Sequence, residues 1–427
     1  MSNGMVQKRF LVILALCLCV GAASAAAQGD ESAESLKELA LAEFDRADYP
    51  AAIEYLERAQ KVAPDDAEVH YLLGYFTHYL CYDSVPLSGF GREKSDEVLG
   101  HLERAVELDP SLGNAYYFIG AEYGARARDE LQAGDAGGAA KELRAGRDAG
   151  GYPDWMLEFG RNLLKSCKRD AILFTGGDAD TNPVEFVQIV EGFRTDVTVI
   201  PVALLSRPWF LLLLRDGLDG AVTAAPVSWT GRQIMDMHPY KWKTNKVRIP
   251  VDERARKEFD SPHRVVIWEV PPGADGRLDA GRAAFADILV TNRFERPVYF
   301  SSGVSSSAFD GLEPLVQITG VARRLLPVEA TADVDVEATA DLMLDPGNFT
   351  AVPGVSQRDM PRASRLLVNY YASYLYMALH YSRADDAAMV DKILAAMRYN
   401  IPESAVPMPE SLRESVTKLE SWAEQNR

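Results

Sequence analysis

Two aspartates, one residue apart, follow a short apolar run near the middle of the chain. They are Asp178 and Asp180, within residues 171–186, AILFTGGDADTNPVEF. Carboxylates at positions i and i+2 after a strand can together hold Mg²⁺, Mn²⁺ or Ca²⁺, because these hard cations prefer oxygen ligands. Such a pair can position the phosphates of a sugar nucleotide or another phosphate ester. One hypothesis is therefore a divalent-cation site for a carbohydrate- or phosphate-containing ligand, and no other cofactor is implied.

The same residues also fit the start of a helix that needs no ligand. Asn182 is a favourable N-cap, Pro183 suits the first helical position and Glu185 the third, which is a capping-box pattern. The glycines at 176–177 allow a tight turn, and the aspartates would lie just ahead of the helix, where negative charge is favoured. The sequence alone leaves both hypotheses open.

Apolar runs and helical patterns alternate from residue 171 onward. The predicted strands are 171–175, 197–205, 265–270, 297–301 and 320–328, and the predicted helices are 182–193, 207–215 and 282–294. This alternation favours a mainly parallel sheet with helices on both faces, in which ligands bind beyond the carboxyl ends of strands. The GGDADT turn lies at such an end. The candidate ligand-binding residues are Gly176, Gly177, Asp178, Asp180, Thr181 and Trp209, and the candidate metal ligands are Asp178 and Asp180.

The N-terminus has the pattern of a secretory leader. Lys8 and Arg9 precede an apolar run at residues 10–20, and small residues at Ala25 to Ala27 form a cleavage site. We expect residues 1–27 to be a signal peptide and the mature chain to be periplasmic or secreted. No later apolar segment in the sequence reaches the ~20 residues that a span needs, so we expect no stable membrane span after cleavage.

Two of the four cysteines belong to this leader. The mature chain would keep Cys81 and Cys167. In an oxidising compartment these two could form a disulfide. Two buried thiols are the alternative, and the sequence does not decide between them.

The N-terminal third contains an internal repeat. Residues 49–59 (YPAAIEYLERA) are matched by residues 97–108 (EVLGHLERAVEL), and a proline follows each copy. A glycine lies ten residues after each proline, at Gly74 and Gly120. The pattern resembles the tetratricopeptide repeat, which is a pair of antiparallel helices. Such an array either offers a groove to a protein partner or serves as a packed helical spacer.

The charge of the chain excludes one class of partner. Its formal net charge is −17, and no cluster of Lys and Arg stands out. A chain this acidic repels phosphate backbones, so we expect no nucleic-acid partner.

Several segments of the middle region together resemble a family of bacterial multi-span membrane proteins related to protein O-mannosyltransferases. The segments are residues 172–183, which carry the GGDADT turn, 191–197 (E-G-x-R-x-D-V), 204–209 (LLSRPW), 296–300 (RPVYF) and 315–324 (LVQITGVARR). In that family these motifs lie in a soluble region after the membrane helices. The resemblance covers about residues 171–327.

This chain differs from the family pattern in ways that bear on function. Ala179 stands where the family has asparagine, and Asn182 stands where it has an aromatic residue. The membrane helices, beside which related enzymes keep their transfer chemistry, are missing. The resemblance therefore implies an accessory or binding domain, with a membrane glycosyltransferase as one partner, more than an enzyme that acts alone.

The C-terminal region is predicted to be helical, and its tyrosines at 370, 371, 374, 376 and 381 are predicted to pack in a core. The predicted fold is helical repeats, then an α/β domain with a mainly parallel sheet, then a helical hairpin. The predicted domains are residues 28–165, 166–335 and 336–427, after the leader. The leading functional hypothesis is a periplasmic or secreted tetratricopeptide-repeat protein that acts as an interaction or accessory module for envelope glycosylation. The alternative is a metal-dependent ligand-binding domain or enzyme that uses Asp178 and Asp180.

Overall fold

The computed structural model describes residues 32–81 and 91–427, which belong to two compact units. The first unit ends at Pro110, and the second runs from Ser111 to Arg427. The predicted leader lies outside the described residues. The domain boundaries predicted at residues 165 and 335 both fall inside the second unit. No helix in the described ranges is long and apolar enough to cross a bilayer.

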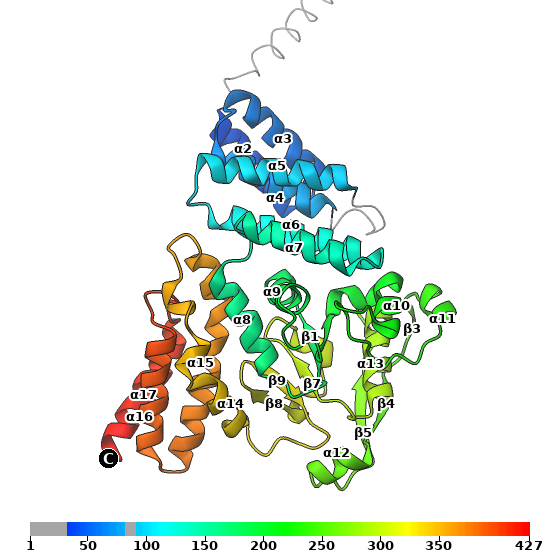
Figure 1. The fold of residues 1–427 in the computed structure, drawn as a ribbon, viewed down its shortest axis with the longest axis vertical. Coiled ribbons are helices and arrows are strands. Elements are labelled where there is room, and N and C mark those ends of the chain that lie inside the picture. Colours follow the sequence, from blue (N-terminus) through cyan, green and yellow to red (C-terminus); the bar gives the residue numbers. More distant parts are fainter. Residues whose placement is uncertain (1–31, 82–90) are drawn as a thin grey trace, which may run out of the picture. The chain divides into compact units, whose positions relative to one another are not determined.

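The described part of the first unit consists of helices that pack in chain order. They are α2 (Ala33–Asp45), α3 (Tyr49–Val62), α4 (Ala67–Tyr79) and α5 (Arg92–Leu108) (Figure 1). The side chains of Asp48 and Asp66 accept hydrogen bonds from backbone N–H groups and so begin α3 and α4. Ala52, Leu56 and Ala59 of α3 are fully buried. The predicted helical repeat is confirmed.

The repeated glycines permit close approach between neighbouring segments. A Cβ atom on Gly74 would lie 2.7 Å from Cγ of Leu102, which is on α5. In the second unit, a Cβ atom on Gly120 would lie 2.5 Å from the carbonyl oxygen of Gly151. Both glycines therefore occupy positions where a side chain has no room, although one faces a side chain and the other faces backbone.

The second unit begins with helices and continues into the α/β region. Its helices are α6 (Gly113–Gln132), α7 (Ala136–Asp148), α8 (Asp154–Lys165), α9 (Asp178–Ile189), α10 (Pro208–Asp216), α11 (Gly231–Met235), α12 (Glu253–Glu258), α13 (Ala280–Asn292), α14 (Val336–Met343), α15 (Met360–Arg383), α16 (Ala387–Asn400) and α17 (Glu410–Gln425). Its strands are β1 (Ile172–Thr175), β2 (Thr198–Pro201), β3 (Tyr240–Lys241), β4 (Asn245–Pro250), β5 (Val265–Val270), β6 (Arg277–Leu278), β7 (Val298–Phe300), β8 (Val316–Thr319) and β9 (Ala322–Leu325).

The main sheet is mixed, with a parallel centre. Its strand order is β2-β1-β7-β9-β8. β1 runs parallel to β2 and to β7, whereas β9 is antiparallel to β7 and to β8. The predicted strand at 265–270 forms as β5, but it pairs with β4 in a separate two-stranded sheet. The parallel prediction thus holds for β2, β1 and β7 only.

Alternate side chains of the central strands enter two different cores. Leu173 and Tyr299 pack with residues of α8, α9 and α15. Ile172, Phe174 and Phe300 pack with residues of α10 and α13. Because successive side chains of a strand point to opposite faces, helices cover both sides of this short sheet, as predicted. Figure 1 shows α8 and α15 on one side of it and α13 on the other.

Two arginines fix the segment that leads into β1. Arg194 donates to the carbonyl oxygens of Leu164 and Cys167, each at 2.9 Å, and pairs with Asp196 at 2.7 Å. This hydrogen-bonded pair lowers the pKa of Asp196 to about 2. Arg296 donates to the carbonyl oxygens of residues 170, 171 and 224 and to the hydroxyl of residue 198. Both arginines belong to the motifs that carry the family resemblance, and both hold backbone in place.

The C-terminal tyrosines pack as predicted in their central part. Tyr370, Tyr371 and Tyr374 are fully buried in the core beside the sheet. The hydroxyl of Tyr371 donates to the carbonyl of Val406 at 2.6 Å. Tyr376 is the exception, because 39% of its surface is exposed.

Cys81 and Cys167, the cysteines of the described residues, are both buried. Cys81 lies in the first unit and Cys167 in the second. Burial raises the pKa of the Cys167 thiol. A disulfide between the two cysteines stays a prediction.

Matched glycine substitutions test the close approach at the repeat position. We expect Gly120→Ala to lower the free energy of unfolding by about 1–3 kcal/mol, because the new methyl group meets backbone that has little freedom to move. Gly100→Ala, in α5, is the control, because a Cβ there meets nothing within 4 Å. That change should raise stability by about 0.5–1 kcal/mol. Urea unfolding followed by circular dichroism measures both, and equal effects would refute the packing argument.

Candidate functional site

The loops after β1 and β7 lead to opposite faces of the sheet. β1 and β7 are parallel neighbours. The chain leaves β1 toward α9, whose Val184 and Val187 lie in the core shared with α8 and α15. It leaves β7 toward Val304 and Phe309, which lie in the other core. A crevice forms outside the carboxyl ends of strands at such a point, and ligands of α/β proteins bind there.

A buried carboxylate ties these two loops together. Asp180, only 2% exposed, accepts a hydrogen bond from the hydroxyl of Ser301 and another, at 2.8 Å, from the backbone N–H of Gly303. Burial raises the pKa of Asp180, and the hydrogen bonds from Ser301 and Gly303 oppose that rise. The carboxylate of the predicted site therefore holds the loop that follows β7.

Glycine is required where the two loops touch. A Cβ atom on Gly176 would lie 2.1 Å from the carbonyl oxygen of Gly303. A Cβ atom on Gly303 would lie 2.5 Å from the carbonyl oxygen of Gly176. Gly177 has a φ of 76° and is the N-cap of α9. Gly176 thus permits the close approach of the loops, and Gly177 permits the turn into the helix.

The predicted helix start was wrong by one turn. α9 begins at Asp178, so that Asn182 is not its N-cap and Pro183 lies inside it. The helix can begin early because Gly177 adopts the turn conformation and Asp178 and Asp180 place negative charge in the first turn. Pro183 removes one backbone N–H donor from the ladder, which the first turns of a helix tolerate better than its middle.

The other polar residues of this turn bind an arginine of α6. Arg128 lies 3.5 Å from a carboxylate oxygen of Asp178 and 3.2 Å from one of Glu185, and it also donates to the side chain of Asn182. Burial raises the pKa of Glu185, and the charge of Arg128 opposes that rise. These contacts explain why α6, predicted to belong with the repeats, is part of the second unit.

Two candidate residues lie away from any open surface of this site. The hydroxyl of Thr181 pairs with that of Thr175 at 2.8 Å, and both side chains are buried. Trp209 lies on α10, where its ring contacts that of Phe210 edge to face, with the centroids 5.5 Å apart. The sequence analysis assigned both to the ligand site. In the structure Thr181 bonds to the end of β1, and the ring contact of Trp209 is with its neighbour on α10.

The turn does not fit a divalent ion as it stands. Two carboxylates that share an ion must point at one place, but Asp180 faces Ser301 and Gly303 whereas Asp178 faces Arg128. In the part of the chain that the structure describes, no group of three or more His, Cys, Asp and Glu side chains could hold a metal ion.

A pocket of about 340 Å³ opens beside the two loops, and we call it the carboxyl-end pocket. Gly176, Asp180 and Gly303 form its floor from the strand ends. The remaining lining residues come from α6, α8, α9, the loop after β7 and α15: Tyr117, Trp155, Met156, Ala179, Ser302, Arg362, Arg365, Leu366 and Asn369. The crevice that the topology predicts is therefore present, and residues of these helices complete it.

The lining combines aromatic surface with positive charge. The guanidinium of Arg362 lies 4.0 Å from the ring centroid of Tyr117 and donates to Asn114 at 2.7 Å. Arg365 is exposed and has no ion pair among the described residues. The Nε1 of Trp155, a residue 5% exposed, and the Oγ of Ser302 are buried without a hydrogen-bond partner there. A ligand with a flat face and a negative group would match this set.

Sequence reasoning named Gly176 and Asp180 of the floor of this pocket, but neither Gly303 nor the walls. Arg362, Arg365 and Asn369 follow one another at helical spacing, so they lie along one stripe of α15. That stripe was a readable signal of a polar face. Its assignment to the crevice needs the packing of α15 on the sheet unit, which no local pattern gives.

Comparison with known proteins gives two partial likenesses. Residues 156–261, from α8 to just beyond α12, match the TMEM260-associated domain 2. The mouse protein named "Protein O-mannosyl-transferase TMEM260" is 33% identical over 63 residues, which are 15% of this chain and 9% of that relative. The aligned part thus spans less than a tenth of the relative. Both findings support an O-mannosyltransferase-like relationship, and the residues of the family match include the GGDADT turn.

Proposed function

We propose that the chain is an accessory, non-catalytic binding module for protein glycosylation of the O-mannosyl type, acting in the periplasm or after secretion. In this proposal the carboxyl-end pocket takes a carbohydrate that carries a negative group. The N-terminal helical repeats, of the tetratricopeptide kind, take a protein partner such as a membrane glycosyltransferase. The observation that carries the proposal is the pocket itself, at the carboxyl ends of β1 and β7.

Three features support binding over chemistry at this place. The aromatic rings of Tyr117 and Trp155 offer flat apolar surface of the kind on which sugar rings stack. Arg362 and Arg365 can form charge-assisted hydrogen bonds to a phosphate or carboxylate. Asp180, the one carboxylate in the lining, is already engaged by two donors and holds the loop.

Removal of Arg365 tests the ligand. We expect mannose 1-phosphate to bind the full chain, and Arg365→Ala to weaken it about tenfold, because a charged hydrogen bond is lost. The affinity for methyl α-mannoside should fall less, since this sugar has no anionic group. Arg383→Ala, also on α15 but outside the pocket, should leave both affinities unchanged. Titration calorimetry measures the affinities. If neither sugar binds, or if both variants lose affinity equally, the proposed ligand class is wrong.

Substitution of Asp180 separates a shaping role from a binding role. Asp180→Asn should lower the free energy of unfolding by about 1–3 kcal/mol, because both donors bind one charged carboxylate oxygen and a neutral amide oxygen accepts them more weakly. Asp178→Asn is the matched control. Its carboxylate is 40% exposed and 3.5 Å from Arg128, so its loss should change stability by at most about 1 kcal/mol.

The same pair of variants gives a pH test. The pKa of Asp180 is raised above its ordinary value of 3.8 by burial, so the native state holds this proton more tightly than the unfolded chain does. The stability that this proton contributes is full below 3.8 and is lost as pH rises through the raised native pKa. The difference in unfolding free energy between wild type and Asp180→Asn should shrink over that range. Urea unfolding at a series of pH values would show a constant difference if the group were unshifted.

Crosslinking tests the partner surface. Leu39 and Leu41 of α2 are large apolar side chains that are 41% and 43% exposed. A photoreactive amino acid at either position should trap a specific partner in the cell that produces the chain. The same amino acid at Tyr399 of α16, which is 73% exposed, is the control for non-specific capture. Equal recovery from both units, or none from the first, would contradict a partner on the repeats.

A further inference from the structure

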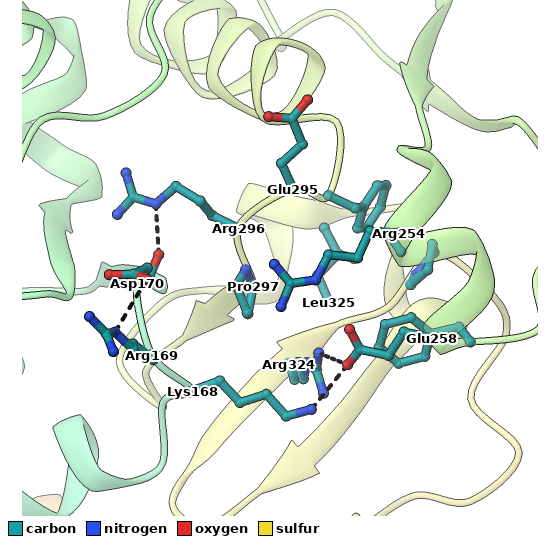
Figure 2. A pocket seen from close by; sticks show the side chains of 14 residues that line it. Lys168, Arg169, Asp170, Arg254, Glu258, Glu295, Arg296, Pro297, Arg324 and Leu325 are labelled. Atoms are coloured by element: carbon teal, nitrogen blue, oxygen red, sulfur yellow. Dashed lines mark hydrogen bonds and ion pairs between the residues drawn. The ribbon is translucent and has the colours of Figure 1, made fainter.

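A second pocket lies at the opposite end of the same strands. Its volume is about 500 Å³, and we call it the amino-end pocket. Residues that precede β1 and β7, at 168–170 and 294–297, line it together with the end of β9 and the helix α12. Figure 2 shows the side chains that surround it. The GGDADT turn plays no part in it.

Basic side chains outnumber acidic ones in this pocket. It is lined by five basic residues, Lys168, Arg169, Arg254, Arg296 and Arg324, and by three acidic residues, Asp170, Glu258 and Glu295. The local excess is two positive charges, in a chain whose formal charge is −17. A local excess of positive charge in an acidic chain requires an explanation at that place.

The acidic residues neutralise only some of the basic ones. Arg169 pairs with Asp170 at 3.6 Å (Figure 2). One carboxylate, that of Glu258, serves both Lys168 at 3.0 Å and Arg324 at 3.2 Å. Arg296 donates only to carbonyl and hydroxyl oxygens, and it has no ion pair in the described ranges. The carboxylate of Glu295 points away from the other charged groups in Figure 2.

One guanidinium group of the pocket is unpaired among the described residues, and a second is paired only in part. The side chain of Arg254 has no hydrogen bond or ion pair among the described residues, and Figure 2 shows it reaching over the pocket toward Pro297 and Leu325. Arg324 is 5% exposed, and its Nε is buried without an acceptor in the described part of the chain. A buried donor without an acceptor is unfavourable, so an anion that reached Arg324 would remove a penalty already present.

We propose that the amino-end pocket binds a phosphate-bearing ligand, with Arg254 as the contact from the open side and Lys168 and Arg324 from the floor. A phosphate monoester carries about two negative charges near neutral pH, which matches the local excess. Arginine presents its donors in a planar fork that fits phosphate oxygens. Apolar side chains of Phe259, Phe294 and Leu325 line the same pocket and would contact the group that carries the phosphate.

Titration of the full chain with pyrophosphate and with phenyl phosphate tests this site. We expect saturable binding that weakens about tenfold in Arg254→Ala, because one charge-assisted hydrogen bond is lost. Arg248→Ala is the matched control, since Arg248 is an exposed arginine of β4 outside the pocket. It removes the same charge from the chain and should change affinity little. Phenyl phosphate should bind more tightly than inorganic phosphate because its ring can reach the apolar wall.

Further arms assign the site and the source of the phosphate. Arg365→Ala, which alters the carboxyl-end pocket, should leave pyrophosphate binding intact. If Arg365→Ala abolished pyrophosphate binding and Arg254→Ala retained it, the anion would lie in the carboxyl-end pocket and this inference would be overturned. Equal loss in Arg254→Ala and Arg248→Ala, or no saturable binding, would also overturn it. Cosedimentation with phosphatidylcholine vesicles that contain phosphatidic acid, dependent on Arg254, would identify a lipid headgroup; binding of the soluble phosphates alone would identify a free ligand.

Discussion

The contact between the loops after β1 and β7 depends on one buried carboxylate. Asp180 accepts from Ser301 and Gly303 at a depth where a charge without partners would be strongly unfavourable. The hydrogen bonds draw the two loops so close that only glycine fits at positions 176 and 303. The space that remains open beside them is the carboxyl-end pocket, so the shape of the site follows from the way this one charge is satisfied.

Other motif residues work in the same manner. Arg323, in the last of the segments that carry the family resemblance, donates to the carbonyl oxygens of Ser301 and Val304, at 2.8 and 2.7 Å. It therefore holds the loop after β7 from the other side, while Arg194 and Arg296 hold the approach to β1. The motif residues act mainly on backbone. The side chains that face the pocket come mostly from α6, α8 and α15, outside the motifs.

The sequence predicted the features that local interactions determine, and it did not predict those that depend on tertiary packing. Apolar runs identified β1, β2, β5 and β7, and the small residues of α3 identified the repeat face. The strand at 265–270 was misplaced because Ile267, which is 45% exposed, hides an alternation in which Val266, Trp268 and Val270 are buried. An alternating strand has one face open and belongs at the margin of a fold, not in the centre of a parallel sheet. The start of α9 was missed because Gly177 adopts the positive φ of the N-cap and Asp180 bonds to the loop after β7, and together these outweigh the local capping pattern at Asn182.

The two pockets share strands but not interior space. β1 has four residues, which corresponds to about 13 Å of extended chain. Between the pockets, Leu173, Phe174, Tyr299 and Phe300 are fully buried, so no ligand passes from one end to the other. The ends also differ in character, because the carboxyl end offers aromatic rings and the amino end offers surplus positive charge.

The acidic chain as a whole repels an approaching anion, but salt near 0.15 M screens that repulsion beyond about 8 Å. Contacts inside a pocket are shorter than this distance, so local guanidinium groups determine affinity while the rest of the chain acts mainly on the rate of approach.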